Sequence, residues 1–181
     1  MRYVGLLRGV NVGGRTLRMS DLRTWIAEAG ATDVTTYIQS GNVVFTHPAR
    51  SAAALTGELE ARLSDAAGFA VAVMLRTAAQ WLGVLRANPF ADRDLAKVHV
   101  GFCAEAPAAA AVAVVDAASA APEELAVVGR EVYLWLPNGV GRGELPARLG
   151  RLRTPVTLRN WNTVTKLAHM VDAASADAAG A

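Results

Sequence analysis

Three stretches of the chain concentrate side chains that could hold an anion. They are residues 6–14, 36–45 and 157–167, and each combines glycine, amide, hydroxyl or basic groups. Guanidinium forks bind phosphate and carboxylate through paired hydrogen bonds, and glycine turns expose backbone N–H groups to the same ligands. The residues predicted to contact a ligand are Arg8, Asn11, Gly13, Gly14, Gln39, Ser40, Asn42, Arg159, Asn160, Asn162, Thr163 and Lys166.

The third stretch is the richest in chemistry. Arg159 is predicted to end a strand, and Asn160 or Asn162 to cap the helix that follows. A helix start offers unpaired N–H groups and the positive end of the helix dipole, and Lys166 adds a charge further along the helix. This pattern favours a phosphate- or nucleotide-like site. A purely structural alternative stays open, in which the same residues cap the helix and Trp161 packs in the core.

The first two stretches carry turn chemistry that matches no common nucleotide motif. The loop after residue 8 lacks the G-x-G-x-x-G pattern of a dinucleotide site and the Gly-Lys-Ser/Thr end of a P-loop. Gln39, Ser40 and Asn42 read either as ligand contacts or as ordinary hairpin-turn residues. Both interpretations remain open at this point.

Signals for catalysis or for a metal centre are weak. His47, His99 and His169 are scattered without the spacing of metal ligands, and Cys103 alone forms neither an internal disulfide nor a structural zinc site. Ser40 lacks the G-x-S-x-G elbow of a nucleophile. The sequence therefore leaves open any cofactor and whether a reaction is catalysed.

Composition excludes two broad classes of protein. The chain has 181 residues, a net charge of +2 and 52% hydrophobic residues, with a mean hydropathy of +0.25, which excludes disorder of the whole chain. Its longest apolar runs fall far short of the roughly 18 to 20 residues that span a bilayer. We expect a cytoplasmic protein without a membrane partner, whose oligomeric state is open.

The net charge hides an uneven distribution. Residues 1–23 carry +4 and residues 142–169 carry +5, whereas residues 24–141 carry −5. Two basic ends on an acidic body favour an anionic partner that contacts groups from both ends.

Hydrophobic periodicity predicts the same order of elements twice. Strands are predicted over 2–10, 34–39, 42–46, 69–76, 97–104, 124–128, 131–136 and 155–159, with helices over 20–29, 55–63, 78–86, 108–119, 144–151 and 162–174. Ser20 is predicted to cap the first helix, and Gly68 to follow the second. The order β-α-β-β-α-β is the ferredoxin-like, split βαβ unit. The predicted fold is therefore α+β, a pseudo-duplication of two ferredoxin-like halves, each with an extra helix.

The halves are predicted at 1–87 and 97–174, joined by a linker at 88–96 and followed by a flexible tail at 175–181. In a split βαβ unit the first two strands are parallel, and the third runs antiparallel between them. The loop at 11–14 and the turn at 39–42 should therefore lie side by side at one sheet edge.

Five motifs in order carry a resemblance to a known family. Leu6–Gly14, Thr36–Phe45, Asn88–Phe90, Lys97–Val100 and Thr157–Leu167 resemble the bacterial domain-of-unknown-function family 1697. The resemblance covers the chain from its first residue to about residue 171. It implies the duplicated ferredoxin-like architecture and no established activity.

The function predicted first is binding of a phosphate-bearing or otherwise anionic small ligand, such as a nucleotide. A nucleic-acid-binding module is the alternative, because ferredoxin-like sheets can stack bases and Phe45, Tyr133 and Trp135 lie on predicted strands. These aromatic residues do not spell the RNP1 pattern. In a third interpretation the motifs only specify the fold of an interaction or housekeeping protein.

Overall fold

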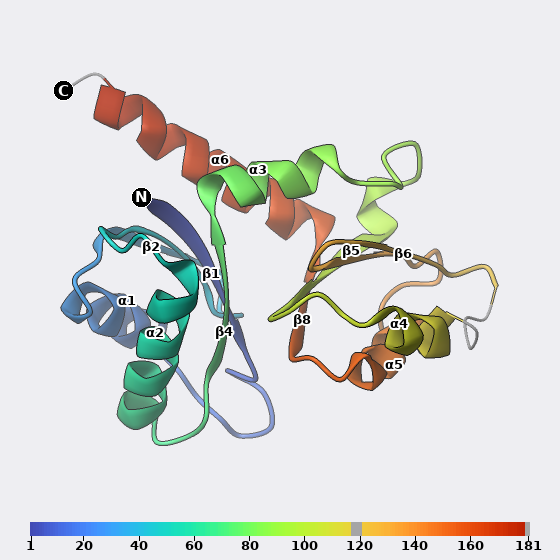
Figure 1. Cartoon of the computed structure of the whole chain (residues 1–181), viewed down its shortest axis with the longest axis horizontal. Coiled ribbons are helices and arrows are strands. Elements are labelled where there is room, and N and C mark those ends of the chain that lie inside the picture. Colours follow the sequence, from blue (N-terminus) through green and yellow to red (C-terminus); the bar gives the residue numbers. More distant parts are fainter. Residues whose placement is uncertain (117–120, 180–181) are drawn as a thin grey trace. The chain divides into compact units, whose positions relative to one another are not determined.

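The computed structural model describes residues 1–116 and 121–179 and confirms the predicted α+β fold. The order β-α-β-β-α-β-α occurs twice along the chain (Figure 1). The first set comprises β1 (Arg2–Arg8), α1 (Met19–Glu28), β2 (Thr32–Tyr37), β3 (Asn42–Thr46), α2 (Ala52–Ala67), β4 (Ala72–Thr77) and α3 (Ala78–Arg86). The second set comprises β5 (Val98–Cys103), α4 (Ala109–Asp116), β6 (Glu124–Val128), β7 (Glu131–Trp135), α5 (Glu144–Arg148), β8 (Val156–Asn160) and α6 (Trp161–Ala179). Two 3-10 helices are η1 (Leu95–Lys97) and η2 (Leu149–Leu152).

The first sheet has the strand order β2-β3-β1-β4, and neighbouring strands run antiparallel. β1 and β2 are therefore parallel and flank β3, as a split βαβ unit requires. Helices α1 and α2 cover one face of this sheet (Figure 1), where Tyr3 and Phe45 stack with ring centroids 5.7 Å apart. Leu6 pairs with Asn42 in the register, so the turn before β3 lies beside the end of β1.

The second sheet repeats this arrangement with the order β6-β7-β5-β8. Its core joins α4 to the sheet, with Val115 packed in one buried cluster with Leu134, Leu149 and Leu152. The same strand order in both sheets confirms the two ferredoxin-like halves.

The repeat extends to the register of individual residues. Arg76 on β4 pairs with Val4 of β1, and Arg159 on β8 pairs with Val100 of β5. Each arginine is buried, with exposed fractions of 1% and 8%, and each stands near the end of its strand, next to a helix. The two halves thus share a buried arginine at an equivalent register position.

The chain divides into two compact units. Unit 1 comprises Met1–Leu82 and Lys166–Ala181, and unit 2 comprises Gly83–Thr165. The C-terminal part of α6 is tied to unit 1 by a hydrogen bond of 3.4 Å from Arg2 Nη2 to the carbonyl oxygen of Met170. The predicted halves at 1–87 and 97–174 follow the order of the elements, whereas the compact units assign the end of the last helix to unit 1.

One predicted helix cap is wrong. Helix α1 begins at Met19, and its N-cap is Arg18, whose side chain makes no capping bond. Met19 is buried in the core of unit 1, and this packing starts the helix before Ser20. In α2, by contrast, Gly68 ends the helix in the left-handed conformation, as predicted.

Other boundaries differ at the helix ends. The helix predicted over 108–119 is observed at Ala109–Asp116, and residues 117–120 lie outside the described part of the chain. The helix predicted over 144–151 divides into α5 and η2. Helix α6 runs to Ala179 instead of ending at Ala174, and residues 180–181 of the predicted tail lie outside the described part.

Within residues 1–116 and 121–179, no helix has both the length and the apolar character to cross a membrane.

Candidate functional site

The loop after β1 and the turn between β2 and β3 lie side by side in unit 1, as predicted. The Asn11 side-chain amide donates a hydrogen bond of 2.6 Å to the carbonyl oxygen of Gln39. The backbone N–H of Leu7 donates to the carbonyl oxygen of Gly41 at 2.8 Å. We call residues 8–18 together with residues 37–42 the loop–hairpin edge.

Asn11 holds the loop in shape. Its amide nitrogen also donates to the carbonyl oxygen of Leu17 at 3.0 Å, and its oxygen accepts from the N–H of Leu17 at 2.8 Å. The residue is in the left-handed conformation at φ 54°, which asparagine tolerates better than most side chains. The polar groups of the Asn11 side chain therefore already have protein partners, and a contact between Asn11 and a ligand stays a prediction.

Asn42 closes the hairpin turn from inside. The side chain is fully buried, and its amide nitrogen donates to the carbonyl oxygen of Tyr37 at 3.0 Å and to Ser40 Oγ at 2.9 Å. Gly41, at φ 74°, packs so closely on β1 that a Cβ atom would lie 2.7 Å from Leu7 Cβ. The turn therefore has one backbone shape, and Gln39 lies exposed at its tip.

The accessible polar groups of the loop–hairpin edge come from its backbone and its arginines. Gly13 and Gly14 have φ values of 57° and 83° and are exposed. In the described chain, no protein group accepts from their N–H groups. Arg8 and Arg15 are exposed on the same edge, where Arg15 Nη1 lies 3.5 Å from where a Cβ atom of Gly9 would stand and the Arg15 guanidinium lies 5.6 Å from the centroid of the Phe69 ring. These groups can surround an anion with N–H donors.

Two exposed apolar side chains on this edge were not foreseen. Val12 on the loop has an exposed fraction of 59%, and Ile38 on the turn has 52%. Ile38 is also left-handed, at φ 49°, which is unusual for a β-branched residue. The signal in the sequence was a β-branched residue placed directly before a turn tripeptide, Gln-Ser-Gly.

Arg159, in unit 2, is buried rather than presented to solvent. Its Nη1 donates to Thr157 Oγ1 at 2.8 Å and to the carbonyl oxygen of Leu158 at 2.9 Å. Desolvation by burial lowers the pKa of the Arg159 guanidinium to about 10, so it stays charged at neutral pH. Its guanidinium thus takes part in holding the end of β8.

The residues after Arg159 divide between capping, packing and exposure. Asn160 caps α6, because its Oδ1 accepts from the N–H of Thr163 at 2.8 Å. Thr163 and Trp161 are buried, whereas Asn162 and Lys166 are exposed. The structural interpretation of this stretch therefore accounts for Asn160, Trp161 and Thr163.

The structure thus brings seven of the twelve predicted residues together at the loop–hairpin edge: Arg8, Asn11, Gly13, Gly14, Gln39, Ser40 and Asn42. Four others belong to unit 2, namely Arg159, Asn160, Asn162 and Thr163, and Lys166 belongs to unit 1. A single site shared by both groups remains a prediction.

Sequence reasoning missed Arg76, the counterpart of Arg159. Arg76 Nη1 donates to the carbonyl oxygen of Leu75 at 3.0 Å. Thr77 and Gln80 then form a reciprocal capping box at the start of α3, with bonds of 3.0 and 3.2 Å. The repeated signal was Leu-Arg-Thr at 75–77 and Leu-Arg-Asn at 158–160.

The histidine and cysteine side chains differ in burial, and His169 is exposed. His47 is buried, and its ring nitrogens contact the carbonyl oxygen of Ala29 at 3.1 Å and the N–H of Ala49 at 3.0 Å. Burial lowers the pKa of His99 from its ordinary value of 6.5. Cys103 is buried. Across residues 1–116 and 121–179, no three His, Cys, Asp or Glu side chains are grouped so that they could hold a metal ion.

Comparisons with known proteins agree with this fold. A family model described as "Protein of unknown function (DUF1697)" matches residues 1–133, which include the loop–hairpin edge. The chain is similar to the solved structure of conserved bacterial protein SP0830 from Streptococcus pneumoniae, with 26% sequence identity and a TM-score of 0.78. That match covers 94% of this chain and 98% of the other. No curated protein matches the chain.

Proposed function

The chain belongs to the DUF1697 family, whose name carries no activity, and we propose from the site itself that the loop–hairpin edge binds a phosphate-bearing or otherwise anionic small ligand. The observation that carries this proposal is the hydrogen bond from Asn11 to the carbonyl oxygen of Gln39. It fixes the glycine loop against the turn, so the loop that carries the exposed N–H groups of Gly13 and Gly14 has its shape before a ligand arrives. A preorganised site avoids part of the entropic cost of binding.

The donors of this edge suit oxyanions. Successive backbone N–H groups in a turn form concavities that attract anions, and Gly13 and Gly14 supply two such groups in a turn. Guanidinium groups add charge-assisted hydrogen bonds that are roughly twice as strong as neutral ones. Residues 1–23 carry a net charge of +4, so the surrounding field also favours an anion.

The predicted ligand residues of unit 1 take two roles in this proposal. Arg8, Gly13, Gly14 and Gln39 contact the ligand, and Arg15 joins them. Asn11, Ser40 and Asn42 maintain the shape of the edge through the hydrogen bonds that they already make. Asn162 and Lys166 are exposed, and they remain predicted anion contacts.

Nucleic-acid binding is the competing candidate, and the aromatic side chains argue against base stacking as its basis. Phe45 is fully buried and stacks on Tyr3. Tyr133 is buried, and its hydroxyl donates to the carbonyl oxygen of Val84 at 2.8 Å. Arg93 covers the ring of Trp135 at 4.7 Å from its centroid. A nucleic acid would then depend on phosphate contacts, which have a steep salt dependence.

The test measures binding of inorganic phosphate, a sugar phosphate, a nucleoside monophosphate and a nucleoside triphosphate to the full chain by calorimetry. We expect at least one to bind, and Arg8→Gln with Arg15→Gln to weaken it roughly tenfold, a loss of about 1.4 kcal/mol. Arg50→Gln is the matched control, because Arg50 is an exposed arginine of unit 1 outside the edge. Its affinity should equal that of the natural chain.

Two results would overturn the proposal. One is a panel in which nothing binds, and the other is an equal loss in Arg50→Gln and in the double variant. A short single-stranded DNA is measured in parallel at several salt concentrations. If it binds far more tightly than the nucleotides, with a log–log salt slope that flattens by about 0.7 per arginine removed, the nucleic-acid candidate replaces the small ligand.

A further inference from the structure

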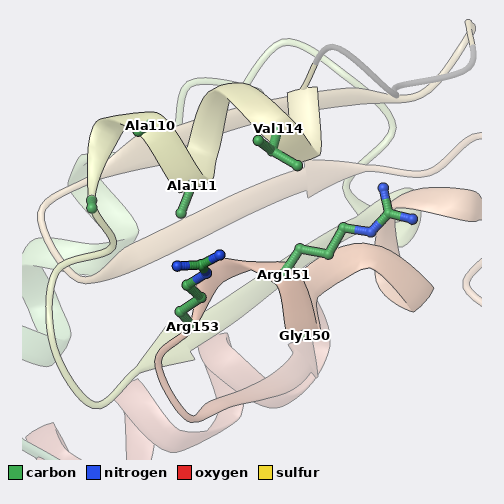
Figure 2. Close-up of a pocket in the computed structure, with 7 residues that line it drawn as sticks. Ala110, Ala111, Val114, Gly150, Arg151 and Arg153 are labelled. Carbon is green, nitrogen blue, oxygen red and sulfur yellow. The ribbon is translucent and has the colours of Figure 1, made fainter.

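A cavity of about 500 Å³ lies within unit 2, between helix α4 and the segment that contains η2 (Figure 2). Its volume falls within the range of small-molecule sites. The lining residues are Ala108, Ala110, Ala111, Val114, Gly150, Arg151 and Arg153. One wall is therefore apolar, and the other carries two arginines.

The apolar wall is the side of α4 that is not buried in the core of unit 2. Helix α4 turns Val115 into the core beside Leu149 and Leu152. Val114, the next residue around the helix, is 53% exposed, and Ala110 is exposed as well. An exposed valine beside alanine side chains gives apolar surface that a hydrophobic group would remove from water.

The charged wall is supplied by η2 and the residues after it. Arg151 and Arg153 are exposed, and neither guanidinium has a hydrogen bond or ion pair with any described residue. Asp116, the acidic residue of α4, does not line the cavity. Figure 2 shows the Arg153 guanidinium below Ala111, while the Arg151 side chain extends toward the end of α4 that carries Val114.

The backbone holds Arg153 in an unusual conformation. Its φ is 58°, in the left-handed region at the end of η2, where a side chain other than glycine or asparagine is uncommon. Gly150, which also lines the cavity, has open space where a Cβ atom would stand. The left-handed backbone places the Arg153 side chain at the cavity. Glycine would adopt the same φ without strain.

We propose that this cavity binds a single-chain anionic amphiphile, meaning a short alkyl chain that carries a phosphate, sulfate or carboxylate group. The alkyl chain lies along Ala110, Ala111 and Val114, and the anionic group contacts Arg153, while Arg151, whose side chain extends the other way in Figure 2, adds positive charge to the same wall. Inorganic phosphate alone would leave the apolar wall unused, and a neutral alcohol would leave both guanidinium groups without a partner. The inference is independent of the proposed function, because it concerns different residues in the other unit.

Titration calorimetry with the full chain tests this proposal with octyl phosphate, inorganic phosphate and octanol, each kept below the concentration at which micelles form. We expect octyl phosphate to bind at least tenfold more tightly than either of the others. From butyl to octyl phosphate, affinity should rise by about twofold to fourfold per methylene, since each buried CH₂ contributes up to about a factor of four.

Substitutions then locate the site. Arg151→Gln and Arg153→Gln should each weaken octyl phosphate binding about fivefold, and Val114→Asp should weaken it further by placing a carboxylate on the apolar wall. Arg142→Gln is the matched control, because it removes an exposed arginine of unit 2 that does not line the cavity. All octyl phosphate titrations are repeated in the Arg8→Gln, Arg15→Gln background, so that binding at the loop–hairpin edge does not contribute, and Arg50→Gln, an exposed arginine of unit 1 outside that edge, should leave octyl phosphate binding unchanged. Circular dichroism checks that each variant folds. If Arg153→Gln does not fold, Arg151→Gln and Val114→Asp are enough to locate the site.

Three results would overturn the proposal. Octanol or phosphate could bind as tightly as octyl phosphate, or Arg142→Gln could lose as much affinity as Arg151→Gln. The chain could also bind vesicles that contain an anionic phospholipid while monomeric octyl phosphate does not bind, which would place the recognition at a membrane surface instead of in the cavity.

Discussion

The Asn11 amide donates to the carbonyl oxygen of Gln39 at 2.6 Å and so joins two loops that lie 28 residues apart in the chain. The same nitrogen donates to the carbonyl oxygen of Leu17, and the side-chain oxygen accepts from the N–H of Leu17. One amide thereby defines both the inner shape of the glycine loop and its position against the hairpin turn. The shape of the loop–hairpin edge therefore depends on the Asn11 side chain, whose amide nitrogen and oxygen already have protein partners.

Replacing Asn11 with glycine tests this role directly. Glycine accepts φ 54° without strain, so Asn11→Gly removes the side-chain hydrogen bonds and leaves the backbone conformation allowed. We expect the free energy of unfolding to fall by roughly 2 kcal/mol, because the paired backbone groups of Leu17 and Gln39 lose their partner. Urea denaturation measures the loss. A change below a few tenths of a kcal/mol would mean that water replaces the amide without cost.

Gly41→Ala should destabilise unit 1 by about 3 kcal/mol, because the new Cβ would lie 2.7 Å from Leu7 Cβ and from Val10 Cγ2 at a φ of 74°. Gly68→Ala is the matched control. Gly68 has the same φ but open space where the methyl group of alanine would stand, so backbone strain alone should cost about 1 kcal/mol. Thermal unfolding of both variants compares the two. Equal losses would show that the turn can move away from β1.

Arg159→Lys should lower stability by about 2 kcal/mol, because lysine lacks the planar guanidinium group whose Nη1 donates both to Thr157 Oγ1 and to the carbonyl oxygen of Leu158. Arg142→Lys, at an exposed position, should change stability by less than about 0.5 kcal/mol. Urea unfolding midpoints measure both. If Arg159→Lys is as stable as the natural chain, a positive charge at this position is enough for stability and the planar guanidinium group is not needed.

Arg153→Gly should raise stability by about 1 kcal/mol, because glycine relieves the left-handed conformation at φ 58°. The same substitution should weaken octyl phosphate binding, since it removes one of the two guanidinium groups of the cavity. Thermal unfolding and calorimetry on one protein sample measure both effects. A gain in stability without a loss of binding would remove Arg153 from the amphiphile site.

His99 makes stability depend on pH in a defined direction. Burial lowers its pKa in the folded chain below 6.5, so the unfolded chain binds more protons as pH falls through that value. The contribution of neutral His99 to the free energy of unfolding is therefore complete above pH 6.5. It is lost progressively as the pH falls from 6.5 to the lower pKa of the folded chain. His99→Gln should therefore reduce the loss of stability between pH 7.5 and pH 5.5, measured as the shift of the urea midpoint. An identical shift in both proteins would assign the pH dependence to other groups.

Local patterns predicted the elements well where one physical signal dominated. The strand Asn42–Thr46 and the helix Ala78–Arg86 have the predicted bounds, because a turn and an Asn-Pro pair delimit them. Prediction failed at Ser20, where burial of Met19 starts the helix earlier than a good capping residue would. Local propensity is a weaker force there than the packing of an apolar side chain.

The sequence predicted that the glycine loop and the hairpin turn lie side by side, which the structure confirms, whereas their contacts with a ligand stay a prediction. Glycine, amide and hydroxyl residues singled out these two loops, and the split βαβ order placed them together. The pattern did not indicate that Asn11 and Asn42 would direct their amides to backbone carbonyls, nor that Val12 and Ile38 would be exposed beside them. Hydrogen-bond partners that are distant in sequence have no local signal.

By itself the sequence determined the order of elements, the duplication and the loops that meet at one sheet edge, because periodicity and turn residues act over a few neighbouring positions. Only the tertiary structure decided which polar side chains are buried and which are exposed to solvent. It buried Arg76 and Arg159 at equivalent register positions, and it placed Arg151 and Arg153 across a cavity from the apolar side of α4. Burial and cavity formation depend on how sheets and helices pack, and that packing joins residues that no spacing rule connects.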